Sequence, residues 1–313
     1  MSTKLDQDMP AELIEEPPMG TGFRLLVGAG ILLTLSGLLH IPVWFLDGGD
    51  WEGRVSWRKP ILFGISTGMT LWSLGWICGA IKRDRFAKFD LVVSFAIAVS
   101  LVIEVALITL QQWRGTASHF NHATEFDGRI DVVMFVLICI AFLGIVYLGI
   151  RSFGFLHLDD EFALAVRSGM VFLILSCIIG FVISSYGYTR TQAGLPPETV
   201  GENGVTKFPH GVAIHVLQIL PAIVFMLRKL NVRSDIRKQF IWCASGSFMS
   251  LLVFACVQTI SGQARFELNS WMGFLLLLVA IAILSVPIAN TLLKIVLNRS
   301  FEKVLEQSKA TEK

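Results

Sequence analysis

The chain is poor in charged residues. Asp, Glu, Lys and Arg make up 16% of its 313 residues, whereas a soluble domain carries about 25%. Hydrophobic residues make up 54% and come in long blocks, which excludes disordered, fibrous and small disulfide-rich proteins and argues against a single soluble domain. The net charge of +2, without a basic face, gives no indication of nucleic-acid binding. We therefore expect an integral membrane protein.

Several cofactor motifs are also missing from the sequence. The five cysteines lie within apolar blocks and form no Cys-x-x-Cys pair, so a disulfide framework, a thiolate metal site and covalent c-type haem are not expected. A Walker A motif is absent, which argues against ATP hydrolysis. No lysine lies in the middle of an apolar block, which excludes a retinal Schiff base.

What the sequence has instead is eight apolar blocks, each close to the length of about 20 residues that crosses a bilayer as a helix. The unbroken apolar runs differ from the alternating strands of a β-barrel. We predict an all-α polytopic transmembrane helix bundle of about eight spans over residues 24–293, with cytoplasmic tails at 1–23 and 294–313. The predicted spans are Leu25–Leu46, Pro60–Ile81, Leu91–Trp113, Val132–Ile150, Ser168–Ser185, Pro209–Leu227, Gln239–Ser261 and Leu268–Leu293.

The distribution of basic residues predicts the orientation of these spans. Most of the 26 Lys and Arg residues lie in the tails and in the loops on the same side as the tails. Because basic loops stay in the cytoplasm, both termini are predicted to be cytoplasmic.

Two pairs of local matches suggest an internal duplication. The third and seventh spans both end in Gln-x-x-x-Gly-x-Ala, at Gln111 and Gln258, and the second and sixth begin at a proline after a lysine, at Lys59–Pro60 and Lys207–Pro209. We predict a possible 4+4 parallel repeat, an arrangement known in transporters.

Glu104 is the one charged residue deep inside a predicted span. An unpaired charge there costs at least about 3 kcal/mol, so this carboxyl group must be protonated, paired or exposed to a wet cavity. It is therefore a candidate functional group, and a neutral Glu that hydrogen-bonds between helices is the alternative.

Other polar side chains lie in the same outer half of the predicted bundle: His40, His215, Gln218, Gln111 and Gln258. Together with Glu104 they form a candidate proton or solute site if their helices touch. His40 and His215, at matched depth, are also candidate ligands for haem or a metal. Ordinary hydrogen bonds between helices are the alternative for each.

The predicted outer loops carry a second set of polar residues. Arg114, His119 and Asn121 follow the third span, and His210 lies near the start of the sixth. We expect these four side chains at the outer mouth of the site, with interfacial anchoring as the alternative.

Three stretches resemble an uncharacterised family of bacterial multi-span membrane proteins. They are Trp57-x-Lys59-Pro60-x-x-Phe63-Gly64, the run Gln111–Gly115 with Ser118–Asn121, and His215-x-x-Gln218-x-x-Pro221. The resemblance covers the first six spans and implies a bacterial inner-membrane location. It implies no activity.

Three hypotheses for function remain open at this point. The first is a transporter of a small solute or ion, linked to protons through Glu104. The second is a membrane redox protein in which His40 and His215 bind haem or a metal. The third is an intramembrane enzyme in which Glu104 is the general acid or base on a lipid or quinone and Arg114 binds its head group.

Overall fold

The computed structural model describes residues 20–267 and 271–290. In this part of the chain, eight helices are long and apolar enough to cross a membrane, which confirms the predicted all-α bundle. They are α1 (Thr21–Asp47), α2 (Arg58–Ala80), α3 (Ala87–Trp113), α4 (Glu125–Ser152), α5 (Asp160–Gln192), the pair α6 (Lys207–Ile214) and α7 (Val216–Lys229), α8 (Ser234–Ile260) and a last helix, Trp271–Asn290. The two short strands β1 (Thr199–Val200) and β2 (Gly204–Val205) form an antiparallel hairpin.

Each predicted span coincides with one of these helices, but several helices extend further. The largest difference is α5, which has 33 residues, because polar turns at its two ends continue a helix whose apolar part is shorter. The eighth predicted span includes residues 268–270 and 291–293, which lie outside the described residues. The predicted C-terminal tail and residues 1–19 of the N-terminal tail lie outside them as well, and α1 begins at Thr21.

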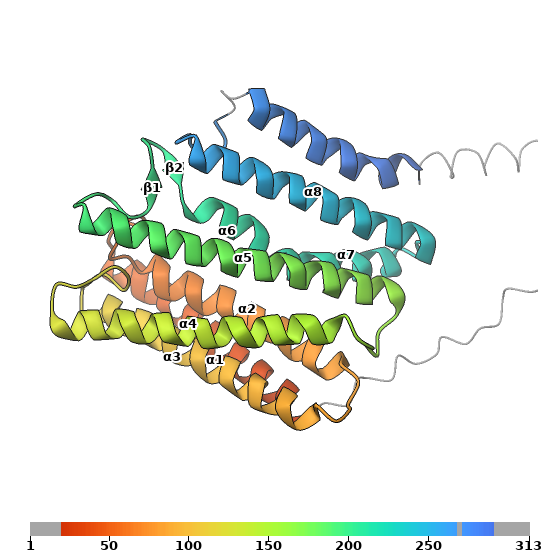
Figure 1. Ribbon diagram of the computed structural model, residues 1–313, viewed down its shortest axis with the longest axis horizontal. Coiled ribbons are helices and arrows are strands. Elements are labelled where there is room, and N and C mark those ends of the chain that lie inside the picture. The colour runs from red at the N-terminus through yellow and green to blue at the C-terminus, as the bar shows by residue number, and fades with distance from the viewer. Residues whose placement is uncertain (1–19, 268–270, 291–313) are drawn as a thin grey trace, which may run out of the picture.

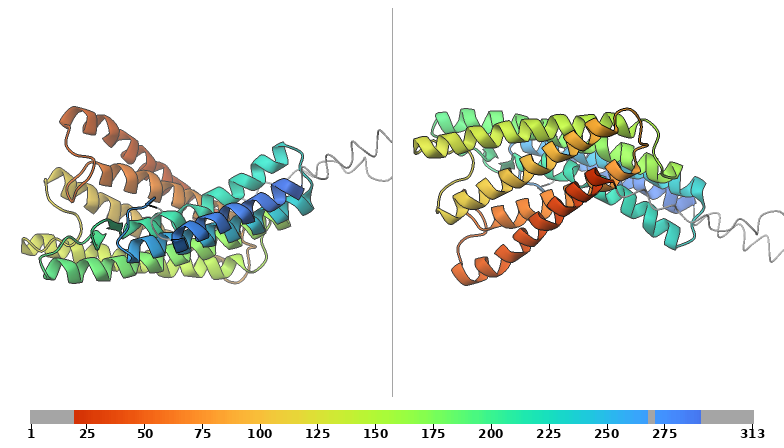
Figure 2. Two further views of the ribbon diagram at one scale, coloured as in Figure 1. Left: turned by 90° about the horizontal axis from the view of Figure 1, so that it is seen from above. Right: turned by 90° about the horizontal axis from the view of Figure 1, so that it is seen from below.

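Successive spans run in opposite directions, so the bundle has two ends (Figure 1). We name them by the ends of α4: the Trp113 end, where α3 ends and α4 begins, and the Arg151 end, where α4 ends. The β1–β2 hairpin lies at the Trp113 end. Figure 2 shows that α1 and α2 diverge from α4 and α5 toward the Trp113 end.

Glycines allow α1 and α2 to pack backbone against backbone. A Cβ atom on Gly64 would lie 2.7 Å from the Cα of Gly37, and one on Gly68 would lie 2.7 Å from the carbonyl oxygen of Gly30. Small residues are the usual means of close helix approach in a bilayer. Trp72 lies in the middle of α2, far from both ends of the helix, and its ring packs against Gly30 of α1.

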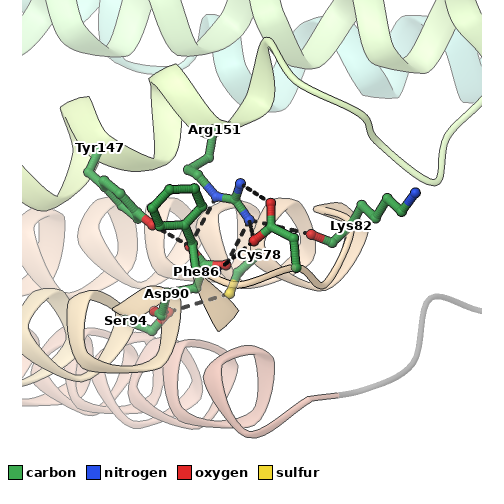
Figure 3. Close-up of polar contacts among 8 residues, drawn as sticks. Cys78, Lys82, Phe86, Asp90, Ser94, Tyr147 and Arg151 are labelled. Carbon is green, nitrogen blue, oxygen red and sulfur yellow. Dashed lines mark hydrogen bonds and ion pairs between the residues drawn. The ribbon is translucent and has the colours of Figure 1, made fainter. Parts of the chain in front are cut away.

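An ion cluster joins α3 to α4 at the Arg151 end (Figure 3). The guanidinium of Arg151 donates from Nε and Nη2 to the two carboxylate oxygens of Asp90, at 3.1 and 3.0 Å. Its Nη1 lies 2.8 Å from Asp84, in the loop before α3. Tyr147 donates to Asp90 at 2.6 Å. This cluster fixes the start of α3 on the end of α4.

A second ion cluster at the same end ties together the later helices. The carboxylate of Glu161, near the start of α5, accepts hydrogen bonds from Arg228 of α7 at 2.7 Å and from Arg237 of α8 at 2.6 Å. Arg167 of α5 also donates to the carbonyl oxygen of Ser152 at the end of α4, at 3.0 Å. Apolar side chains of α1 to α5 pack into one core, and these polar contacts join the helix ends at the Arg151 end.

The ends of α3 and α8 have the same backbone structure. The amide of Thr116 donates to the carbonyl of Gln111 at 3.0 Å, and that of Gln263 donates to the carbonyl of Gln258 at 3.0 Å. In both turns a glycine, Gly115 or Gly262, adopts a positive φ of 67° or 69°, the geometry that ends a helix at glycine. A 4+4 duplication would place these two turns at equivalent positions of the two halves. The duplication itself remains a prediction.

We expect Gly64→Val to lower the free energy of unfolding by about 1–3 kcal/mol, because a side chain forces α1 away from α2. The matched control is Gly28→Val on α1, where an added Cβ meets nothing within 4 Å. Thermal unfolding of the purified protein measures both. Equal melting temperatures for the two variants would contradict the close packing of α1 on α2.

We expect Arg151→Met to destabilise the protein by about 2–5 kcal/mol, because it leaves the largely buried Asp90 carboxylate without its cation. Adding Asp90→Asn to this variant should restore part of the loss. A double variant as unstable as the sum of the two single variants would show that Arg151 and Asp90 do not interact.

Candidate functional site

A cavity of about 650 Å³ lies at the Trp113 end, between α2, α3, α4, α5, α6 and the loop 114–124. His122 and Tyr188 line its mouth, and the buried side chains of Leu101, Ile145 and Leu173 line its deep end. A volume of this size accommodates a small organic molecule. Most of its wall surface is apolar, although about half of its lining residues carry a polar side chain.

Glu104 lies near the deep end of the cavity, one turn of α3 from Leu101. The residue is 8% exposed. One of its carboxyl oxygens, Oε2, is buried and has no hydrogen-bond partner within the described residues. A buried polar atom usually has a partner, so the hydrogen-bonding capacity of this carboxyl group is not met within the described residues.

His210, on α6, lines the same cavity. Its Nδ1 lies 2.9 Å from the carbonyl oxygen of Ser176 on α5. A carbonyl oxygen can only accept, so Nδ1 carries the hydrogen, and Nε2 is the acceptor of the neutral ring. The hydroxyl of Ser176 donates back to the carbonyl of His210 at 3.1 Å. The bond from Nδ1 holds the imidazole in one orientation, and the bond to the backbone carbonyl joins α5 to α6.

His119 enters the cavity from the loop between α3 and α4. Its ring stacks on Phe63 at 5.9 Å between centroids, and its Nδ1 lies 2.9 Å from the hydroxyl of Ser118. Burial, and secondarily the charge of Lys59, lower the pKa of His119 from its ordinary value of 6.5 to about 3. This imidazole is therefore neutral at physiological pH.

The mouth of the cavity carries a carboxylate and two aromatic rings. Asp131, one to two turns into α4, accepts a hydrogen bond from the backbone amide of Phe120 at 3.0 Å and lies 3.7 Å from Nε2 of His122. The ring of Phe120 packs on Gly187 of α5, where a Cβ atom would lie 2.5 Å from that ring. His122 meets Tyr188 edge to face at 5.7 Å. The loop 114–124 is thus docked between α4 and α5.

Other residues predicted to form the site have structural contacts elsewhere. Gln111 and Arg114 both bind the carboxylate of Asp127, at 3.0 and 2.6 Å, which links the end of α3 to the start of α4. The side chain of Asn121 donates to Thr116 within the loop at 2.8 Å.

His40 lies on α1 among aromatic side chains. Its Nε2 accepts from the indole of Trp113 at 3.2 Å, and its Nδ1 donates to the carbonyl of Ser36 at 2.7 Å. His215 lies between α6 and α7, where the sixth span is interrupted. Because α1 packs on α2 and α3, whereas α6 packs on α5 and α8, the structure places His40 and His215 in different parts of the bundle.

The remaining glutamines lie outside the cavity. Gln218 lines a separate pocket of about 260 Å³ with Trp72 and Trp76, between α2 and α7. Gln258 donates to the carbonyl oxygens of Ala264 and Glu267 in the turn after α8. Glu104, His119 and His210 are thus the predicted residues that the cavity brings together. Among the described residues, no group of three or more His, Cys, Asp and Glu side chains is arranged to hold a metal ion.

Several cavity residues are not among the predicted site residues. They are Thr70, Asp131, Cys177, Ser184, Ser185 and Tyr188. Asp131 lies within α4 but outside the apolar block, so hydropathy assigns it to the loop. A pair of neighbouring serines near the end of the fifth span was the available signal for Ser184 and Ser185.

No protein-family model, curated protein or solved structure matches this chain. The resemblance to a family of bacterial membrane proteins therefore stays a prediction, and the function must be argued from the cavity.

The neutral state of His119 has a consequence for stability. Between pH 6.5 and about 3 the unfolded chain binds a proton at this residue and the folded chain does not, so stability falls as the pH falls through this range. As the pH is lowered between these values, we expect the melting temperature of His119→Gln to fall less than that of the wild type. Identical pH dependence in the two proteins would contradict the burial of a neutral imidazole.

Proposed function

We propose that this protein is a secondary transporter of a small solute, linked to protons through Glu104. In this proposal the chain resides in a bacterial inner membrane with both termini in the cytoplasm. The Trp113 end then faces outward, and the cavity is the outward-open substrate site.

The observation that carries the proposal is the position of Glu104. A carboxyl group near the middle of a membrane protein is costly, and such groups are characteristic of proton and ion pathways. This one has a buried oxygen without a partner in the described chain and lies on a cavity large enough for a solute. In this proposal a proton and a bound solute compete for the Glu104 carboxyl group, which is the elementary requirement for coupling.

The interruption of the sixth span also supports transport. The helix breaks at His215, between Gly211 and Pro221, and the half before the break carries His210 of the cavity. Discontinuous helices at the binding site are a recurring feature of secondary transporters. The cavity lies toward the Trp113 end, and ion clusters join the helix ends at the Arg151 end.

The contacts of the structure favour transport over the other two hypotheses. Both ring nitrogens of His40 are already hydrogen-bonded, which weighs against a haem or metal ligand. The sequence Gly64-x-Ser66-x-Gly68 has the spacing of a hydrolase nucleophile motif. That motif requires a sharp turn between a strand and a helix, whereas here it lies inside α2 and its glycines pack on α1.

Proton flux in proteoliposomes tests the proposal. We expect solutes from a panel of organic cations, neutral amphiphiles and organic anions to drive proton movement, reported by a pH-sensitive dye inside the vesicles. Glu104→Gln should abolish this coupled proton movement, because an amide cannot exchange the proton.

The matched control is Glu202→Gln, at an exposed position of the β1–β2 turn, which should transport like the wild type. Failure of every solute class to move protons, or proton movement that persists in Glu104→Gln, would contradict the proposed function.

A further inference from the structure

The ionisable groups of the cavity determine which charge it accepts. They are Glu104 of α3, Asp131 of α4, Cys177 and Tyr188 of α5, His210 of α6, and His119 and His122 of the loop 114–124. No lysine or arginine lines the cavity in the described part of the chain. The nearby Lys59 ammonium is turned to the loops, where it donates to the carbonyl of Arg54 at 2.6 Å and to Ser118 at 3.5 Å. The cavity therefore has two carboxyl groups to balance a cation, and no lysine or arginine side chain among its described lining residues to balance an anion.

The walls of the cavity favour an organic ion over a small hydrated one. Phe135 and Phe181, in contact at 6.1 Å between centroids, join Phe120 and Tyr188 as aromatic lining residues. Aromatic faces attract organic cations. A metal ion needs several oxygen or nitrogen ligands to replace its water, and the described residues hold no group of three or more acidic, His or Cys side chains arranged for this.

We propose that the substrate of this cavity is a hydrophobic organic monocation, which binds in exchange for the proton of Glu104. In this step the protonated carboxyl group of Glu104 and a free cation form a carboxylate–cation pair and release one proton. Of the two lining carboxylates, Asp131 already binds the amide of Phe120 and lies beside His122 at the mouth, so the one at the deep end, Glu104, matches a single positive charge. The volume of about 650 Å³ matches a drug-sized molecule. This inference rests on the proposed function, because it fills the same cavity.

Tetraphenylphosphonium and tetraphenylborate form a matched pair of probes, with nearly the same shape and opposite charge. Equilibrium dialysis of the detergent-solubilised protein measures their binding, and calorimetry in two buffers of different ionisation heat measures the proton released. We expect saturable binding of tetraphenylphosphonium, up to one proton released per cation bound, and tighter binding as the pH rises.

Two variants and one control test the residues involved. Glu104→Gln should bind tetraphenylphosphonium at least about tenfold more weakly and release no proton. Ser184→Phe retains Glu104 but fills the cavity, so it should also lose binding, which keeps the test valid if Glu104→Gln folds poorly. Glu202→Gln should bind like the wild type.

Equal or tighter binding of tetraphenylborate, absence of saturable tetraphenylphosphonium binding, or unchanged binding in both cavity variants would overturn the inference. These outcomes are distinct from failure of the proposed function. If another solute class, and not the cation, drives Glu104-dependent proton flux, the proposed transport function stands and the inference of a cationic substrate is contradicted. If the cation binds with proton release but drives no proton flux in proteoliposomes, the inference about the site stands and the proposed transport function is contradicted.

Discussion

Polar groups inside a bilayer must find partners within the protein, and this constraint explains most of the described structure. At the Arg151 end, Asp90 and Glu161 are each held by arginines from neighbouring helices. At the Trp113 end, Asp127 binds Gln111 and Arg114. Glu104 departs from this pattern, as do Gln218 and Gln258, since each has a buried side-chain atom without a partner in the described residues, and of these three Glu104 lines the cavity at the Trp113 end. A group left in this condition beside a cavity points to binding.

The same contacts explain why the helices are joined at one end and diverge toward the other. Glycines hold α1 close to α2 along their length, while the ion clusters of Arg151 and Glu161 fix the helix ends where α4 and α5 meet. Toward the other end, α1 and α2 diverge from α4 and α5 (Figure 2), and the loop 114–124 packs over the cavity instead of a helix. The interrupted sixth span brings His210 to this end of the bundle.

The sequence was sufficient to predict the eight spans and the position of Glu104 inside the third, because apolar length and a single charge within it are local properties. It also suggested the depth at which polar residues lie. Depth does not determine the direction in which a helix face points: His40 faces Trp113, and Gln111 faces Asp127. His119 reaches the cavity only because its loop folds back between α4 and α5, a contact between distant segments that spacing does not reveal.

The central claim is that Glu104 is a proton site reached from the cavity. Infrared difference spectroscopy of the carboxyl stretch measures this directly, with Glu104→Gln to assign the band. We expect a Glu104 band that exchanges rapidly in deuterated water and changes when a ligand enters the cavity. A band that exchanges slowly and does not respond to any bound solute would contradict the claim and identify Glu104 as a structural glutamic acid.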